Sequence, residues 1–244
     1  MRTAGGGGPA TPVEVMVSPL GSAVPFRGLV SSFFVTVTLL AVLWALQVYN
    51  VATDDSLLPH GISPRDKAEL PDILTAPFLH FGFGHLISNT VPVAVLGFLC
   101  ATRGVSRFVG LTLVIVVVGG LGVWLTSPAN SVTAGASILV FGYFGYLLVR
   151  GFLDRKLLDI LIAFVVTGVY GWSMLMGVLP TADHVSWQGH LFGFVGGVAA
   201  AYVFRRRRDK PREADGGSRT VGAHRTTAAG PRPLSDELKD LGLL

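Results

Sequence analysis

Long runs of apolar residues recur along the chain and are typical of membrane-spanning helices. The runs cover residues 29–48, 83–101, 108–125, 137–149, 157–175 and 187–204. A helix needs about 20 apolar residues to cross the hydrocarbon layer of a bilayer. Strands of a membrane barrel would alternate polar and apolar residues, and these runs do not alternate. The pattern therefore predicts an all-α polytopic membrane protein with six transmembrane helices.

Composition supports this assignment. Half of the 244 residues are hydrophobic and 14% are charged, and the mean hydropathy is +0.58. These values are too apolar for a soluble domain of this length. The single cysteine, Cys100, excludes an internal disulfide. The net charge of +4 comes from basic residues at the ends of the apolar runs, so we expect a lipid bilayer and no nucleic acid as a partner.

Both ends of the chain differ from the apolar centre. Residues 1–27 contain the stretch GGGGPATP and predict a flexible arm, without the pattern of a removable signal peptide. Residues 28–204 form the predicted six-helix membrane domain. Residues 205–244 begin with four arginines and predict a basic, disordered tail.

Charge at the ends of the runs predicts the orientation. Basic residues follow the second, fourth and sixth runs: Arg103, Arg107, Arg150, Arg155, Lys156 and residues 205–208. The opposite side carries two basic residues and six acidic ones. Because basic residues concentrate on the cytoplasmic side, we expect both termini in the cytoplasm and an external loop over residues 51–79. We expect the protein to lie in the inner (plasma) membrane.

The fourth run is short, and its polar residues are expected to lie inside the membrane. From Ser137 to Arg150 a helix covers only about 20 Å, so the helix should begin below the outer surface. His190 should lie roughly 5 Å and Asn89 roughly 9 Å below that surface. Irregular backbone at this depth requires protein or a water-filled cavity around it. We predict a polar pocket, open to the outside, that contains Ser137, His85, Asn89 and His190.

These residue types suit nucleophilic chemistry. A serine hydroxyl becomes a useful nucleophile when a neighbouring imidazole takes its proton, and Ser137 and His190 supply that pair. Donors are also needed for the oxyanion that forms during such a reaction. His85 and Asn89 are four residues apart and share one helix face, and Ser137 begins its helix, where backbone N–H groups are free.

Glycines are expected to bring the fourth and sixth helices together. Gly189, Gly193 and Gly197 recur every four residues, and the fourth run contains Gly142 and Gly145. Small-residue strips of this kind allow close helix packing. Packing along them would bring His190 within reach of Ser137.

Three motifs resemble those of the rhomboid intramembrane serine proteases in order and spacing. They are HFGFGHLISN with His80, His85 and Asn89; GAS with Gly135 and Ser137, followed by Gly145; and SWQGHLFGFVGG with Gly189, His190, Gly193 and Gly197. The resemblance covers residues 28–204. It implies cleavage of other proteins' transmembrane segments by a serine–histidine dyad without a carboxylate, and no metal or organic cofactor.

The resemblance also implies roles for individual residues. Ser137 would be the nucleophile and His190 the general base, while His85, Asn89 and the Ser137 backbone N–H would form the oxyanion hole. Phe141 and Gly135 would support them, and His80 either supports the pocket or lies at the membrane interface. Two positions depart from the motifs of many active relatives: Ile138 replaces glycine and Phe141 replaces tyrosine. Ile138 could restrict the loop or reshape the pocket, whereas Phe141 keeps an aromatic platform for His190.

Two alternatives come from other functional classes. One is a catalytically silent rhomboid-like protein that binds transmembrane helices, which would keep the fold and lose the dyad. The other is a metal-dependent membrane protein that uses His80, His85 and His190. The predicted spans contain one acidic residue, Asp159, and the chain has no H-E-x-x-H pattern, so the sequence favours the serine chemistry.

Overall fold

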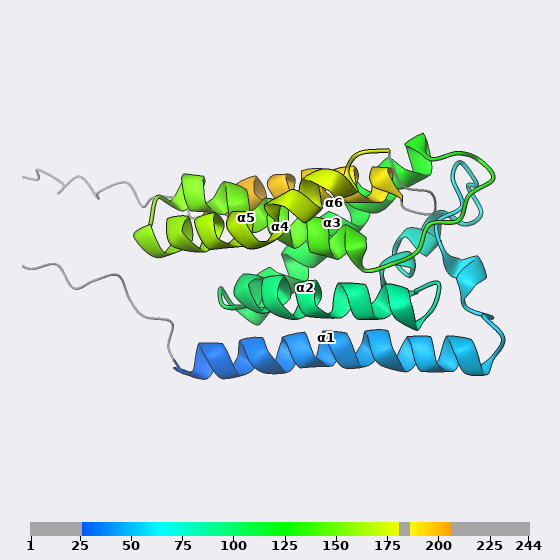
Figure 1. Cartoon of the computed structure of the whole chain (residues 1–244), viewed down its shortest axis with the longest axis horizontal. Helices are drawn as coiled ribbons and strands as arrows, with labels where there is room; N and C mark the ends of the chain where they lie inside the picture. The colour runs from blue at the N-terminus through cyan, green and yellow to red at the C-terminus, as the bar shows by residue number, and fades with distance from the viewer. Residues whose placement is uncertain (1–25, 181–185, 206–244) are drawn as a thin grey trace, which may run out of the picture. The chain divides into compact units, whose positions relative to one another are not determined.

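The computed structural model describes residues 26–180 and 186–205, which form six α-helices and three 3₁₀-helices (Figure 1). The α-helices are α1 (Phe26–Ala52), α2 (Phe83–Ala101), α3 (Val105–Thr126), α4 (Ser137–Asp154), α5 (Leu157–Gly177) and α6 (Trp187–Val203). The 3₁₀-helices η1 (Leu58–His60), η2 (Leu70–Ile73) and η3 (Ala76–Phe78) lie between α1 and α2. The prediction of an all-helical protein with six helices is confirmed. Most of the predicted arm and tail falls outside the described residues.

Five of these helices are long and apolar enough to cross a membrane: α1 (over Gly28–Ala52), α2, α3, α4 and α5. Helix α6 is equally apolar in sequence but has 17 residues. This length is slightly below the roughly 20 residues that a straight crossing requires. The chain is therefore a multi-pass membrane protein, and α6 is the shortest of its described α-helices.

Helix α4 is the centre of the bundle. In its most apolar stretch 67% of the residues are buried, against 17% in α1 and in α5. It contacts α2, α3, α5 and α6, whereas α1 packs mainly on α2. Residues at the centre of a helical membrane protein face other helices and not lipid, which is why α4 can carry polar groups.

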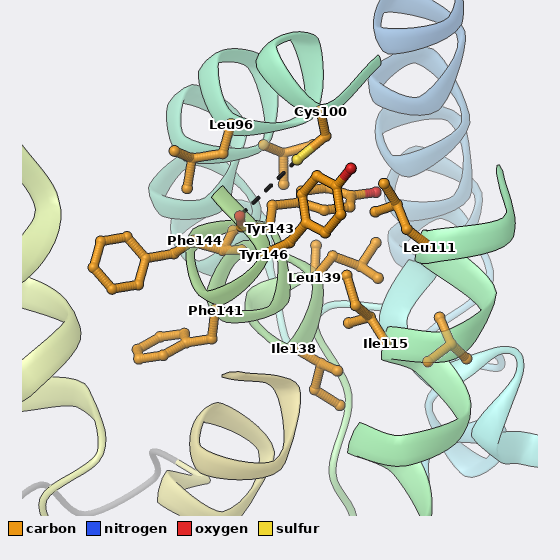
Figure 2. Close-up of a cluster of buried hydrophobic side chains, with 14 of the residues drawn as sticks. Leu96, Cys100, Leu111, Ile115, Ile138, Leu139, Phe141, Tyr143, Phe144 and Tyr146 are labelled. Atoms are coloured by element: carbon orange, nitrogen blue, oxygen red, sulfur yellow. Dashed lines mark hydrogen bonds between the residues drawn. The ribbon is translucent and has the colours of Figure 1, made fainter. Parts of the chain in front are cut away.

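The apolar core surrounds α4 on the sides of α2 and α3. Leu139 and Tyr143 of α4 are completely buried, together with Leu96 of α2 and Leu111 and Ile115 of α3. Figure 2 shows these side chains converging around the α4 ribbon. The Tyr143 hydroxyl lies 3.0 Å from Thr112 Oγ1, so its one polar atom has a partner inside the core.

The end of α4 differs from the prediction. We expected the helix to end at Val149, with Arg150 marking the membrane surface. Instead Arg150 is 7% exposed and forms ion pairs with Asp154 of α4 and Asp159 of α5. Because these carboxylates neutralise the buried arginine, the helix can continue past it to Asp154 and has 18 residues.

This ion-pair cluster also affects the basic residues from which the membrane orientation was predicted. Arg103, in the connection between α2 and α3, pairs with Asp159 and lies 3.5 Å from Asp154. Two of the basic residues used to predict orientation are thus paired with acidic residues at the same end of the bundle. Asp154 is also a second acidic residue within the described α-helices, where only Asp159 was expected.

Helices α4 and α6 are in backbone contact along their glycines. A β-carbon at Gly197 would lie 1.9 Å from the Gly142 carbonyl oxygen, and one at Gly193 would lie 2.5 Å from the Ile138 carbonyl oxygen. On the other helix, a β-carbon at Gly145 would lie 2.7 Å from the Phe194 carbonyl oxygen. Larger residues at these positions would push the two helices apart.

Hydrogen bonds to the α1–α2 connection hold the segment before α4. Ile62 and Thr133 exchange backbone hydrogen bonds of 2.8 and 3.0 Å. The Gly135 N–H donates to the Ala76 carbonyl at 2.9 Å. Residues 133–136 are buried although they are not helical, and these bonds give partners to both backbone groups of Thr133 and to the Gly135 N–H. In Figure 1, α4 starts further inside the bundle than the neighbouring ends of α2 and α6.

Candidate active site

A cavity of about 1180 Å³ opens where α2, α4 and α6 begin and α5 ends. Side chains from all four helices line it, as does the segment that precedes α4. Four lining residues are the polar residues singled out in the sequence, namely Ser137, His190, His85 and Asn89. Among the described residues that line it, none is Asp, Glu, Lys or Arg. The cavity is therefore polar through hydroxyl, amide and imidazole groups.

Ser137 is the first residue of α4 and is half-buried at the wall of the cavity. The first intrahelical hydrogen bond runs from the Val140 N–H to the Ala136 carbonyl at 3.0 Å. The N–H groups in the turn between them, including that of Ser137, precede the helical ladder. A negative charge that develops beside Ser137 would meet these N–H groups and the positive end of the helix dipole.

His190 is the fourth residue of α6, and two groups clamp its ring. The ring stacks on Phe141 of α4, with centroids 4.0 Å apart and planes 7° apart. Its Nδ1 atom lies 2.7 Å from the carbonyl oxygen of Gly177, the last residue of α5. A carbonyl only accepts hydrogen bonds, so the proton of neutral His190 is on Nδ1 and its Nε2 atom keeps a lone pair.

Ser137 and His190 share the cavity without a direct bond. Among the described residues, neither side chain donates to or accepts from the other. Hydrogen bonds between catalytic groups are often long when the site holds no substrate and shorten when a substrate binds. The structure thus brings the two residues to one cavity, where a hydroxyl proton could pass to an imidazole.

His85 and Asn89 lie one turn apart on α2. The Asn89 Nδ2 atom donates to the His85 carbonyl at 3.1 Å, which uses one of the two amide N–H groups. The His85 ring lies parallel to that of Phe81, with centroids 6.4 Å apart. His85 and Asn89 both line the cavity, and each keeps a side-chain donor for a bound group.

His80 supports the segment before Ser137 from outside the cavity. Its side chain is 1% exposed, and its Nε2 atom accepts the Ala136 N–H at 3.2 Å. Burial, together with the neighbouring His85, lowers the pKa of His80 from 6.5 to about 4. His80 therefore remains neutral and able to accept at physiological pH.

Gly135 is required by its conformation and by its neighbour. Its φ is +136°, a region that side chains other than glycine rarely adopt. A β-carbon there would also lie 2.5 Å from Cε1 of His85. The backbone at Gly135 thus packs directly on the His85 ring and fixes the approach of α2 to Ser137.

Several site groups were missed in the sequence. Gly177 holds Nδ1 of His190, and Tyr170, Ser173 and Met174 of α5 line the cavity beside it. Nothing in the spacing of α5 marks these residues, because a glycine near a helix end is usually a cap. Their role depends on where the end of α5 packs, which only the tertiary structure shows.

The histidines among the described residues do not form a cluster that could hold a metal. His80 and His85 pack edge to face, with centroids 5.1 Å apart. Within residues 26–180 and 186–205, no three His, Cys, Asp or Glu residues come together in a way that could hold a metal ion. The set of His80, His85 and His190 weighed in the sequence analysis is therefore not assembled as a three-ligand site.

Comparison with known proteins agrees with this architecture. Residues 67–207 match the rhomboid domain family. The chain is 41% identical over 183 residues to the uncharacterized protein Rv1337 of Mycobacterium tuberculosis (strain H37Rv), which covers 72% of this chain and 76% of that protein. Over the same length it is 38% identical to the uncharacterized protein ML1171 of Mycobacterium leprae, covering 72% of each.

A more distant relative has a name that refers to activity. "Putative rhomboid protease YdcA" of Bacillus subtilis (strain 168) is 24% identical over 139 residues, which cover 57% of this chain and 69% of that protein. The family match spans more than half of the chain and contains α2 to α6. The chain therefore belongs to the rhomboid family.

Proposed function

We propose that this protein is an intramembrane serine endopeptidase with Ser137 as nucleophile and His190 as general base. The observation that supports this most directly is that both residues line one polar cavity while Gly177 fixes the His190 proton on Nδ1. This arrangement leaves Nε2 free to take a proton. Membership of the rhomboid family supports the same conclusion.

The reaction would proceed through an acyl-enzyme. The Ser137 oxygen attacks the carbonyl carbon of the scissile peptide bond, and its proton moves to Nε2 of His190. Protonated His190 then gives this proton to the leaving amine as the carbon–nitrogen bond breaks. Water attacks the resulting ester, again losing a proton to His190, and the second product leaves as Ser137 is restored.

The oxyanion formed in both steps would be stabilised by donors around the start of α4. The Ser137 backbone N–H, the Asn89 amide and the His85 ring all border the cavity. Donors aimed at a developing negative charge act strongly in a site with restricted water. Among the described residues of the cavity wall, none is Asp or Glu, so none of these opposes the oxyanion.

Substrates would be transmembrane segments of other proteins. The cavity lies between helices of a multi-pass membrane protein. In the proposed function, a peptide would enter it from the bilayer and water would enter it from an aqueous side. We further propose that both termini lie in the cytoplasm and that the cavity faces the outer side. Arg103 and Arg150 are paired with carboxylates and are left out of the charge comparison. The proposed orientation then rests on Arg107, Arg155, Lys156 and the arginines from residue 205 onward.

Labelling with a fluorophosphonate tests the nucleophile. The purified protein should be labelled, and labelling should disappear in Ser137→Ala and fall sharply in His190→Ala because the hydroxyl is then not activated. Ser131→Ala is the matched control, because Ser131 is another cavity-wall serine, with its hydroxyl bonded to the Pro128 carbonyl. Labelling that persists in Ser137→Ala would remove Ser137 from this role.

Co-expression with a panel of tagged single-span reporters tests the activity itself. Cleavage by the parent and not by Ser137→Ala establishes an endopeptidase. Binding of reporters without cleavage, equal in the two proteins, would support the catalytically silent alternative.

Orientation is tested separately with reporters fused to the two termini, both of which should report a cytoplasmic location.

A further inference from the structure

The His190 ring is held at its Nδ1 atom by a main-chain carbonyl, at the position where serine hydrolases generally use a carboxylate. The Nδ1 atom is 2.7 Å from the Gly177 oxygen, so this hydrogen bond already occupies it. Phe141 covers one ring face at 4.0 Å. The ring is thus fixed at an edge by α5 and on a face by α4.

The Gly177 carbonyl is available because it lies at the end of α5. The last four carbonyls of a helix have no intrahelical donor. Two nearby carbonyls are used locally, since Val178 N–H donates to Met174 at 3.3 Å and Leu179 N–H donates to Met176 at 3.2 Å. The Gly177 carbonyl accepts from His190 instead. The end of the helix dipole is negative, which favours a cation beside it.

Only glycine allows this approach. A β-carbon at residue 177 would lie 2.6 Å from Cζ of Phe141 and 3.1 Å from Nδ1 of His190. Either the aromatic ring or the imidazole would have to move. The absence of a side chain therefore lets α5 end directly against the stacked pair.

We propose that the Gly177 carbonyl at the end of α5 orients His190 and fixes its tautomer, so that Gly177 is a positioning residue for proton transfer from Ser137. This rests on the proposed function of Ser137 and His190. The same carbonyl would also stabilise the imidazolium that forms after the proton moves, as a buried carboxylate does in other serine hydrolases. His190 can then act as the base only when the end of α5 packs against α4 and α6.

Main-chain substitution tests the carbonyl without adding atoms. Replacing Val178 by its α-hydroxy acid makes the 177–178 link an ester, whose carbonyl is a weaker acceptor. We expect fluorophosphonate labelling of Ser137 to slow about three- to tenfold, the range for losing one hydrogen bond. The matched control is an ester at the 178–179 link, which removes the Leu179 N–H bond to Met176 and leaves the Gly177 carbonyl an amide. It should change the rate less than twofold.

A side-chain variant and a spectroscopic readout complete the test. Gly177→Ala should slow labelling more than the ester does. Gly168→Ala, on the same helix with open space around it, is the control and should not slow labelling. In ¹⁵N NMR spectra, His190 should be the Nδ1–H tautomer in the parent and a mixture in the 177–178 ester. Ser137-dependent labelling that is as fast in this ester as in the parent, with the tautomer unchanged, would overturn the proposal. A parent with no Ser137-dependent labelling would instead reject the proposed function.

Discussion

At the scale of single residues, Ile138 shows how the structure accommodates a departure from the family motif. Its side chain is 1% exposed and does not line the cavity. A β-carbon at Gly119 of α3 would lie 2.6 Å from its Cγ2 atom, and one at Gly189 of α6 would lie 3.3 Å from its Cγ1 atom. Figure 2 shows Ile138 and Phe141 leaving α4 in different directions. Ile138 thus fills a space left by glycines on two neighbouring helices.

This packing sets the expected effect of Ile138→Gly. The variant would leave a void beside Gly119 and place a flexible residue directly after Ser137, so we expect lower stability and less labelled protein. Truncating a buried isoleucine to alanine costs about 2–5 kcal/mol, and glycine in a helix adds about 1 kcal/mol. Thermal unfolding in detergent measures the loss. Ile138→Val is the control, at about 0.5–1.5 kcal/mol; a Tm for Ile138→Gly at or above that of the parent would show that the isoleucine strains the site.

Asn89 offers a matched comparison within one helix turn. Asn89 and Ser88 both line the cavity and both donate to the His85 carbonyl, at 3.1 and 2.7 Å. We expect Asn89→Ala to slow reporter cleavage about tenfold to thousandfold, the range for loss of one oxyanion donor. Ser88→Ala removes a similar local hydrogen bond and should have little effect. Equal rates for the two variants would exclude a special role for the Asn89 amide.

At the scale of elements, the position of Ser137 is decided by a segment distant in sequence. The connection between α1 and α2 supplies His80, Ala76 and Ile62, which bond residues 133–136 just before α4. Gly135 then turns the chain against the His85 ring of α2. The hydroxyl, the imidazole of α6 and the donors of α2 are therefore oriented by connections and helix ends more than by the helices themselves.

The His80 tether predicts a pH dependence of stability. Folding lowers the pKa of His80 from 6.5 to about 4, chiefly by burial and secondly through His85. Between these values the unfolded chain binds a proton that the folded chain does not, so stability rises with pH through this window and is lost on acidification. His80→Gln keeps an acceptor that does not titrate there. Its Tm should fall less than that of the parent between about pH 6.5 and 4; identical slopes would remove His80 as the cause.

At the scale of the whole molecule, the two ends of the bundle have different electrostatics. The end with the cavity has polar but uncharged walls among the described residues. The other end holds Arg103 and Arg150 with Asp154 and Asp159. This cluster joins the α2–α3 connection to α4 and α5. Breaking a buried pair leaves an uncompensated charge, which destabilises far more than loss of an exposed pair.

Arg150→Ala is expected to destabilise the bundle by about 3–5 kcal/mol, because the buried Asp159 and the partly buried Asp154 would then share Arg103. Thermal unfolding in detergent should show this as a lower Tm. Arg155→Ala, at an exposed position, is the control and should change the Tm little. The double variant Arg150→Ala/Asp159→Ala leaves Arg103 with Asp154 and should recover part of the loss. Full stability of Arg150→Ala would contradict a structural role for the cluster.

The membrane environment explains why the sequence predicts the helices of this fold but not all of their ends. Six apolar runs are enough to predict the helices, since an apolar segment of that length has few alternatives in a membrane. The end of α4 was predicted wrongly because a lone arginine in a sequence marks a surface, whereas Arg150 is neutralised by Asp159, a partner on another helix. Helix ends that depend on such partners cannot be derived from local composition.

The candidate site likewise has some features that the sequence predicted and others that only the structure shows. Its side chains, Ser137, His190, His85 and Asn89, were identified from residue type and helical spacing, which are local properties of the sequence. The structure alone placed the Gly177 carbonyl against Nδ1 of His190 and the α1–α2 connection against the start of α4. Main-chain carbonyls and N–H groups are present in every residue, so their partners carry no sequence signal. They become specific only when helix ends are packed together.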